Sequence, residues 1–163
     1  MTTATIASSL FVWLKPLHQS MACPLFLPTS SLGELSAIAP PLGDLLAGNC
    51  AADPSAVIET DILRRCCNFG YARDHCERAA QADADAARFM IQGERDAVVQ
   101  VAWALEKDHH PVAVGVIEVG DLAEAEPSGD ALLAQARSCA RTYRRQAHAR
   151  AVNPGRMPTP EHP

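Results

Sequence analysis

Hydrophobic and polar residues alternate along three consecutive runs between residues 86 and 119. A period of two is typical of a β-strand with one buried face. The polar segments Gly93–Asp96 and Asp108–Pro111 separate the runs and contain residue types that are common in turns. The pattern therefore predicts a three-stranded antiparallel meander over residues 86–119. One face of its middle strand is predicted to carry Val99, Val101, Trp103 and Leu105.

A helical spacing of apolar residues follows Asp53 and Pro54. Aspartate is a favoured N-cap, and proline is favoured at the first helical position. Apolar residues then recur at intervals of three and four as far as Cys67. Asn68 and Gly70 are residue types that tolerate positive φ, so we expect the helix to end there. The pattern predicts a short helix from Asp53 to Cys67.

A second helical stripe follows Ser128, the predicted N-cap, and extends to about Ala149. Its apolar face includes Leu132, Cys139 and Tyr143, and its other face is rich in arginine. These arginines are compatible with an anionic ligand, but we favour a solvated face that complements the helix dipole. The predicted fold class is α+β, with this helix packed on the three-stranded meander.

Residues 21–54 follow neither period and are rich in proline, glycine and serine. Pro40 and Pro41 exclude a helix through that point, because proline lacks an N–H and restricts the residue before it. We therefore expect a Pro-rich N-terminal arm that needs a further constraint, such as a bound metal, to hold it against a compact domain. This arm and the short helix after it would carry a cysteine site.

The length of 163 residues is that of one domain. Residues 1–20 are predicted to be a disordered leader or an over-called start that precedes Met21, and residues 151–163 a disordered Pro-rich tail. A single cysteine-containing domain then occupies residues 21–150. The apolar stretch near the N-terminus has no Lys or Arg before it, unlike a secretory signal, so we expect a cytoplasmic protein.

Charge and hydropathy narrow the choice of partner. The net charge of -5 argues against nucleic-acid binding, which needs a basic surface. No apolar run reaches the length of about eighteen residues that a membrane span requires. We expect a protein partner whose identity the sequence does not give. Because no phosphate-binding glycine motif, serine elbow or pair of catalytic carboxylates occurs, no catalytic residue is predicted and a non-enzymatic role is favoured.

Cysteine is concentrated in one part of the chain, because four of the six cysteines lie between Cys50 and Cys76, and Cys23 precedes them. In a cytoplasmic protein such residues are more often thiols or metal ligands than disulfides. We predict that Cys23, Cys50, Cys67 and Cys76 converge on one metal centre. No Cys-x-x-Cys pair occurs, so each thiolate would come from a separate segment. Four thiolates suit Zn²⁺ or an iron–sulfur cluster.

The apolar and aromatic residues near these cysteines, among them Phe26, Phe69 and Tyr71, favour an iron–sulfur cluster, since low water access tunes such a centre. The sequence thus predicts a small metal-binding protein, with an iron–sulfur cluster, for electron transfer or redox sensing. A zinc-structured interaction domain and a metal-free domain with thiols in its core are the alternatives.

The remaining candidates are assigned to structural roles. Cys66 follows apolar residues at helical spacing and cannot easily share a metal with adjacent Cys67, so we place it in the core. Cys139, on the apolar stripe of the last helix, is also predicted to be core. His109 and His110 could act as a ligand or a proton donor, but their setting is typical of a solvated turn.

Four segments resemble a group of small bacterial four-cysteine proteins that have no established function. These segments are Cys23–Pro28, Pro41–Cys50, Cys67–Cys76 and Leu105–Pro111. The resemblance covers roughly residues 21–150, and its most specific part is Cys-Asn-Phe-Gly-Tyr-Ala-Arg-Asp-His-Cys at Cys67–Cys76. It implies a domain of this length and order, with Cys67 rather than Cys66 among the four cysteines.

Overall fold

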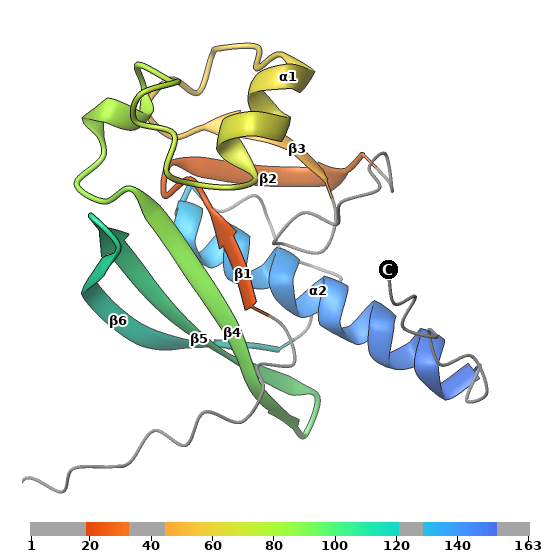
Figure 1. The fold of residues 1–163 in the computed structure, drawn as a ribbon. Coiled ribbons are helices and arrows are strands. Elements are labelled where there is room, and N and C mark those ends of the chain that lie inside the picture. The colour runs from red at the N-terminus through yellow and green to blue at the C-terminus, as the bar shows by residue number, and fades with distance from the viewer. Residues whose placement is uncertain (1–18, 33–44, 121–128, 153–163) are drawn as a thin grey trace, which may run out of the picture.

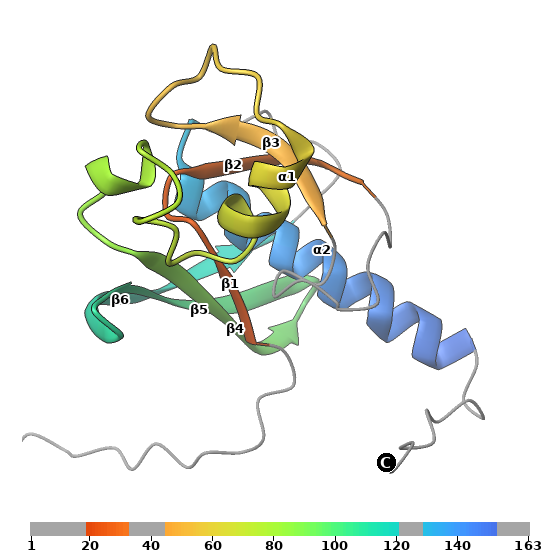
Figure 2. The same cartoon turned by 45° about the horizontal axis from the view of Figure 1, so that its top comes forward.

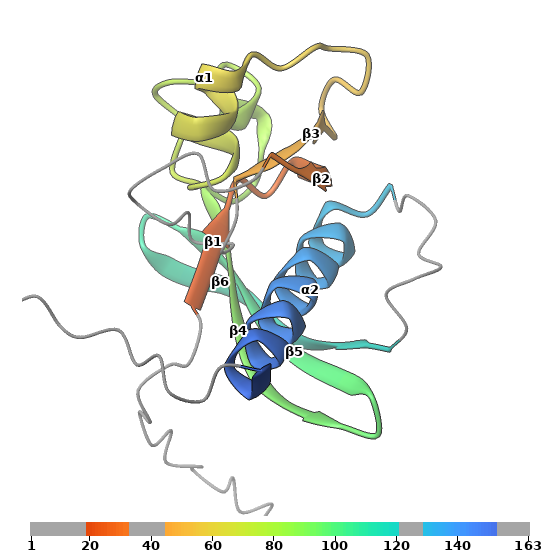
Figure 3. The same cartoon turned by 90° about the vertical axis from the view of Figure 1, so that its right-hand side faces the viewer.

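The computed structural model describes residues 19–32, 45–120 and 129–152. Its fold is α+β, as expected, with two antiparallel sheets and a long C-terminal helix packed on them (Figure 1). Figures 1 and 3 show the smaller sheet and helix α1 together at one end of the larger sheet. Among the described residues, no helix has both the length and the apolar character needed to cross a membrane.

The larger sheet has four strands rather than the three expected, because an N-terminal strand joins it. Its order is β1-β4-β5-β6, and each neighbouring pair is antiparallel. Strand β1 covers Gln19–Ala22, so the sheet begins two residues before the predicted domain boundary. The other strands are β4 (Ala86–Arg95), β5 (Val98–Lys107) and β6 (His110–Val119). The predicted buried face of β5 is confirmed: Val99, Val101, Trp103 and Leu105 all contact the core.

The strands β4, β5 and β6 are joined by turns shorter than the sequence indicated. Asp96 and Ala97 connect the first two, and Asp108 and His109 the next two. All four have positive φ, as type I′ turns require, and this turn type matches the twist of the strands. The prediction of a turn over four residues from Gly93 was wrong, because Gly93 follows a bulge and stays within β4.

The N-terminal arm is not irregular throughout, because part of it forms a second sheet. Strand β2 (Phe26–Ser31) pairs antiparallel with β3 (Leu46–Cys50), with Phe26 opposite Cys50. Pro28 is tolerated because each strand of a two-stranded sheet has one edge without a partner, and the register shifts just after Pro28. Pro40 and Pro41 lie outside the described residues.

The first helix begins later than predicted. Helix α1 covers Thr60–Ile62 and continues as a widened turn, η1, over Leu63–Cys67. Asp53 does not cap it, since its carboxylate accepts a hydrogen bond from Ser55 (3.0 Å) and pairs with Arg78 (3.3 Å). The end at Cys67 is confirmed. A single 3₁₀ turn, η2 (Ala79–Gln81), follows before β4.

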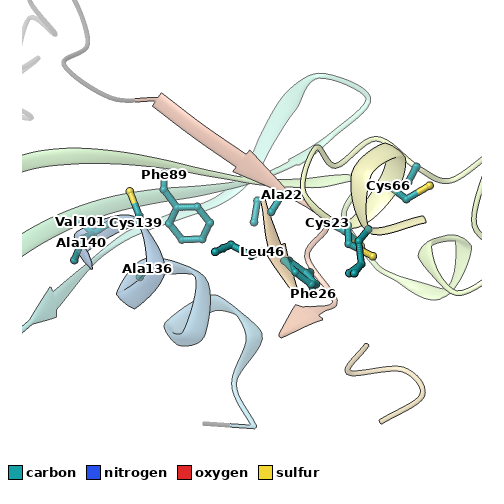
Figure 4. Close-up of a cluster of buried hydrophobic side chains, with 14 of the residues drawn as sticks. Ala22, Cys23, Phe26, Leu46, Cys66, Phe89, Val101, Ala136, Cys139 and Ala140 are labelled. Atoms are coloured by element: carbon teal, nitrogen blue, oxygen red, sulfur yellow. The ribbon is translucent and has the colours of Figure 1, made fainter. Parts of the chain in front are cut away.

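The C-terminal helix α2 covers Ala131–Val152, three residues beyond the predicted end. Asp130 caps it, since Oδ1 accepts from the N–H groups of Leu132 (2.9 Å) and Leu133 (3.3 Å). Ser128, the predicted cap, and residues 153–163 of the predicted tail lie outside the described residues. Helix α2 packs on the main sheet and, near its N-terminus, on β2 (Figure 2). Figure 4 shows the buried side chains between them, which include Phe26, Phe89, Val101, Ala136, Cys139 and Ala140.

We expect Phe89→Ala to lower the free energy of unfolding by about 3–5 kcal/mol, because the ring is fully buried and its loss leaves a cavity. Urea denaturation followed by circular dichroism measures this change. The control is Val57→Ala, at a side chain that is 93% exposed, which should cost under about 0.5 kcal/mol. Equal effects of the two substitutions would contradict the core described here.

Candidate metal centre

The four cysteines predicted as ligands line one small cavity, although they come from four separate segments. Cys23 follows β1, Cys50 ends β3, Cys67 ends the widened turn η1, and Cys76 precedes η2. The cavity volume is about 10 Å³, and the other residues around it are almost all apolar. All six cysteines of the chain are thiols rather than disulfides. The fold therefore places four thiols, separated by up to 53 positions in the chain, around one small space.

Backbone hydrogen bonds tie these segments together next to the cavity. The N–H of Cys23 donates to the carbonyl of Cys67 at 3.0 Å. The N–H of Ala51, directly after Cys50, donates to the carbonyl of Leu25 at 2.8 Å. The positions of three of the cysteines are thus set by main-chain contacts, which are independent of any bound ion.

Asn68 links the end of the helix to β3. Its side chain is fully buried, and its Oδ1 accepts from the N–H of Leu46 at 3.0 Å. Its Nδ2 donates to the carbonyls of Leu46 (3.0 Å) and Leu63 (2.9 Å). Asn68 does not use its tolerance of positive φ, because its φ is -83°. The residue ends the helix through its side chain instead.

The chain reverses after Asn68 at two residues with positive φ. Gly70 has φ of 70° and Tyr71 has φ of 51°. A Cβ atom on Gly70 would lie 2.9 Å from the Cβ of Ala86 and 3.0 Å from the carbonyl oxygen of Ala22, so only glycine fits between β1 and β4. The N–H of Tyr71 then donates to the carbonyl of Asp85 at 2.8 Å. This reversal sends the Cys76 segment back past the cavity.

Two polar clusters fasten the segment between Cys67 and Cys76 to the main sheet. In the first, the Tyr71 hydroxyl donates to Glu106 at 2.5 Å. Arg88 holds the same carboxylate with two hydrogen bonds of 2.7 Å and 3.0 Å. The ring of Tyr71 stacks on that of His109 with 4.4 Å between centroids. His109 therefore contacts the cysteine segment but is not among the residues that line the cavity.

The second cluster is centred on Asp85, immediately before β4. Its Oδ1 accepts from Arg73 Nε at 2.7 Å, and its Oδ2 accepts from the N–H of Asp108 at 2.8 Å. Arg73 also donates to the carbonyl of Ala82 at 2.9 Å. The cysteine segment is thus joined to the β5–β6 turn by a second, charged connection. Beyond this turn, His110 Nδ1 lies 2.7 Å from the Asp108 carbonyl oxygen.

Gln135 of α2 is a buried residue that the sequence reasoning missed. Its side chain is fully buried, and Nε2 donates to the carbonyls of Cys23 (2.8 Å) and Phe26 (2.7 Å). The long helix therefore holds the turn that carries Cys23. Its position along the helix could have revealed it. Gln135 falls between Leu132 and Cys139 on the apolar stripe, where a polar residue needs a buried partner.

Burial raises the pKa of the Cys23 and Cys67 thiols and so keeps them protonated in the absence of a cation. It raises the pKa of Cys23 to about 11, although a hydrogen bond from the Leu25 N–H opposes the shift. Burial also raises the pKa of Cys67 to about 12, with smaller contributions from the thiolates of the neighbouring cysteines. Metal binding at these sulfurs would therefore release protons.

Cys66 is a fifth thiol at the same cavity. It is 2% exposed and packs in the core, as expected, but it also lines the cavity beside Cys67. Cys139 instead packs with Ala136 and Ala140 in the part of the core beneath the main sheet (Figure 4). Both cysteines were predicted to lie in the core and outside the site; Cys139 does lie away from the cavity, whereas Cys66 lines it.

The small volume of the cavity limits the size of the metal centre that it could hold without movement of the surrounding side chains. A volume of about 10 Å³ is close to that of one water-sized sphere. In the described ranges, no three His, Cys, Asp or Glu side chains already stand in positions that would coordinate an ion. The thiols therefore line the space, and they would have to come closer together to bind a metal.

Comparison of the chain with protein-family models, with curated proteins and with solved structures found no match.

We expect Glu106→Gln to make the free energy of unfolding less dependent on pH in acid. The hydrogen bonds and charge of Arg88 lower the pKa of Glu106. A carboxyl group with a lowered folded-state pKa stabilises the fold above its unfolded-state pKa, and this contribution is lost as the pH falls through the folded-state pKa. The wild type should lose it below about pH 4, and the variant should lack it at every pH.

Urea denaturation between neutral and acidic pH measures this difference. At pH 7 the variant should be about 1–3 kcal/mol less stable, since a carboxylate with charged hydrogen-bond partners is lost. Asp61→Asn is the control, because the Asp61–Arg65 pair (3.0 Å) is exposed and contributes little. Parallel pH profiles for the wild type and Glu106→Gln would show that Glu106 does not stabilise the fold.

Proposed function

We propose that this protein binds a metal centre through Cys23, Cys50, Cys67 and Cys76. The centre we propose is an iron–sulfur cluster that serves electron transfer or redox sensing in the cytoplasm, together with a protein partner. One observation carries the proposal, namely that four thiols from four segments line a single small cavity. Thiolates brought together in this way are the ligand set of iron–sulfur clusters and of structural zinc.

The surroundings of the thiols support the cluster. Leu25, Phe26, Ile58 and Ile62 line the cavity and limit the access of water. The N–H of Leu25 donates to the sulfur of Cys23. Burial and hydrogen bonds to sulfur are two of the properties by which a protein sets the reduction potential of a cluster. When bound, the cluster would supply one-electron chemistry, while the chain would supply the four sulfurs, the apolar wall and this N–H group.

Contacts between two of the segments that resemble the bacterial four-cysteine proteins further support the proposed site. Tyr71 and Arg73 belong to one segment, and Glu106 and Asp108 belong to another. The side chain of Tyr71 binds Glu106, while Arg73 and Asp108 share the carboxylate of Asp85. If the resemblance holds, Tyr71, Glu106 and Asp108 of its motifs would thus serve to hold the Cys67–Cys76 segment in place.

A structural zinc ion is the alternative, and the size of the cavity favours it. A volume of about 10 Å³ suits a single ion better than a cluster of several iron and sulfur atoms. Four thiolates at about 2.3 Å would close a tetrahedral zinc site and join the four segments. In that case the protein would be a zinc-structured interaction domain.

Purification of the full chain without air tests these proposals. A brown protein with iron and acid-labile sulfide in equal amounts would support the cluster, and a colourless protein with one zinc per chain would support the alternative. Metal analysis and the visible absorption spectrum give the answer in one preparation. Absence of both iron and zinc would contradict the metal centre and leave a metal-free domain.

Adjacent Cys66 and Cys67 provide a matched pair of variants. We expect Cys67→Ser to lose most of the bound iron or zinc and to become less soluble, because metal binding is coupled to folding. We expect Cys66→Ala to keep the metal and to lose only about 1 kcal/mol of stability. Metal content per chain is the measurement. Equal metal content in the two variants would contradict the assignment, and loss only in Cys66→Ala would identify Cys66 as the ligand.

A further inference from the structure

A second and larger cavity lies beside the cysteine cavity and opens to solvent. Its volume is about 530 Å³, and small-molecule sites usually have volumes of about 300–1,000 Å³. Ile62 and Cys66 line both cavities, so the two spaces share part of one wall. We call this second cavity the outer pocket. Its other lining residues are Asp61, Arg64, Arg65, Phe69 and His75.

The widened turn η1 supplies the basic side of the outer pocket. The N–H of Asn68 donates to the carbonyl of Leu63, five residues back, at 3.1 Å, so this turn is wider than that of an α-helix. Arg64 and Arg65 both lie on it. Turns of this width are rare and occur frequently at functional sites. The local backbone is therefore a second reason, besides the cavity, to look for a ligand here.

Arg64 carries the uncompensated charge of the outer pocket. Arg65 pairs with Asp61 at 3.0 Å, so these two side chains together carry no net charge. Within residues 19–32, 45–120 and 129–152, the Arg64 guanidinium has no hydrogen bond or ion pair, and neither has the His75 ring. A neutral imidazole still offers one N–H donor. One free guanidinium and one further donor at the same pocket suit an anionic group.

Phe69 gives the outer pocket an aromatic side. Its ring is half-buried, and it is not among the described side chains that pack on the hydrophobic core. Ile62 and Cys66 extend the apolar surface of the pocket. An aromatic ring of a ligand would find a flat apolar partner here, next to the basic groups. The pocket therefore combines an apolar wall with a few polar groups, as small-molecule sites do.

We propose that the outer pocket binds a small organic anion in which an aromatic group carries a carboxylate, sulfonate or phosphate. The anionic group accepts hydrogen bonds from Arg64 and His75, and the aromatic group packs on Phe69 and Ile62. The bound molecule would lie against Cys66, beside the cysteine cavity. The proposal does not depend on a metal in that cavity, because none of the groups that hold the anion is one of the four proposed ligands.

Fluorescence titration of the full chain with 8-anilinonaphthalene-1-sulfonate tests the anionic contact. The wild type should bind one molecule per chain, and Arg64→Ala should raise the Kd about tenfold, because a charge-assisted hydrogen bond is lost. The control Arg95→Ala removes the same charge from an exposed arginine at the end of β4 and should change the Kd less than about twofold. No binding by the wild type, or an equal loss in both variants, would overturn the proposal.

The neutral probe N-phenyl-1-naphthylamine separates the two parts of the pocket, because it has the same aromatic groups without the sulfonate. Phe69→Ala should weaken the binding of both probes, whereas Arg64→Ala should weaken only that of the sulfonate. Circular dichroism verifies that both variants are folded. If Arg64→Ala weakened the two probes equally, or if folded Phe69→Ala bound both as the wild type does, the assigned contacts would be wrong.

Nuclear magnetic resonance of the wild type locates the bound probe without any substitution. Addition of 8-anilinonaphthalene-1-sulfonate should shift the amide signals of residues 61–75 most, since these residues include nearly all of the pocket lining. Strand β6, with its exposed Val112 and Val114, is the internal control and should shift little. Larger shifts on β6 than on residues 61–75 would show that the probe binds to exposed apolar surface and would contradict the outer pocket as its site.

Discussion

The carboxylate of Glu106 holds the Cys67–Cys76 segment in place against the main sheet. Arg88 of β4 holds it with two hydrogen bonds, and the Tyr71 hydroxyl donates to it from the other side. The left-handed backbone at Gly70 brings Tyr71 to this position. Cys67 precedes the reversal and Cys76 follows it, so the direction in which both thiols approach the cavity is set by the sheet. A metal at this site would complete a geometry that charged hydrogen bonds already hold.

The parts of the fold that the sequence predicted are those set by local pattern. The alternation along β5 follows from one buried face, and Val99 and Val101 are fully buried. The strands β2 and β3 have no such alternation, because each is short and carries a proline or a glycine. Asp53 has the local signature of a helix cap, but its carboxylate is taken by Arg78, 25 residues away. A local pattern of residues along the chain contains no information on such long-range competition.

The same distinction, between local sequence pattern and long-range contacts, explains which residues of the candidate site were predicted. Cysteine enrichment led to the selection of Cys23 and Cys50 as ligands, and both line the cavity. The roles of Cys66 and Gln135 depend on which way a helical side chain points once the helices have packed. The helical spacing placed Cys66 correctly in the core, yet the core and the cavity are continuous, so one residue belongs to both. A core position and a site position are therefore not exclusive in this protein.

The hydrogen bond from Gln135 to the Cys23 carbonyl spans 112 residues of sequence. The hairpins of β4, β5 and β6 are closed by two-residue turns, so they can form while the chain is still being synthesised. The turn at Cys23 acquires its partner only after the start of α2, which carries Gln135, has been synthesised. The contact that fixes the Cys23 turn to α2 is consequently among the last to form, after every segment that lines the cavity has been synthesised.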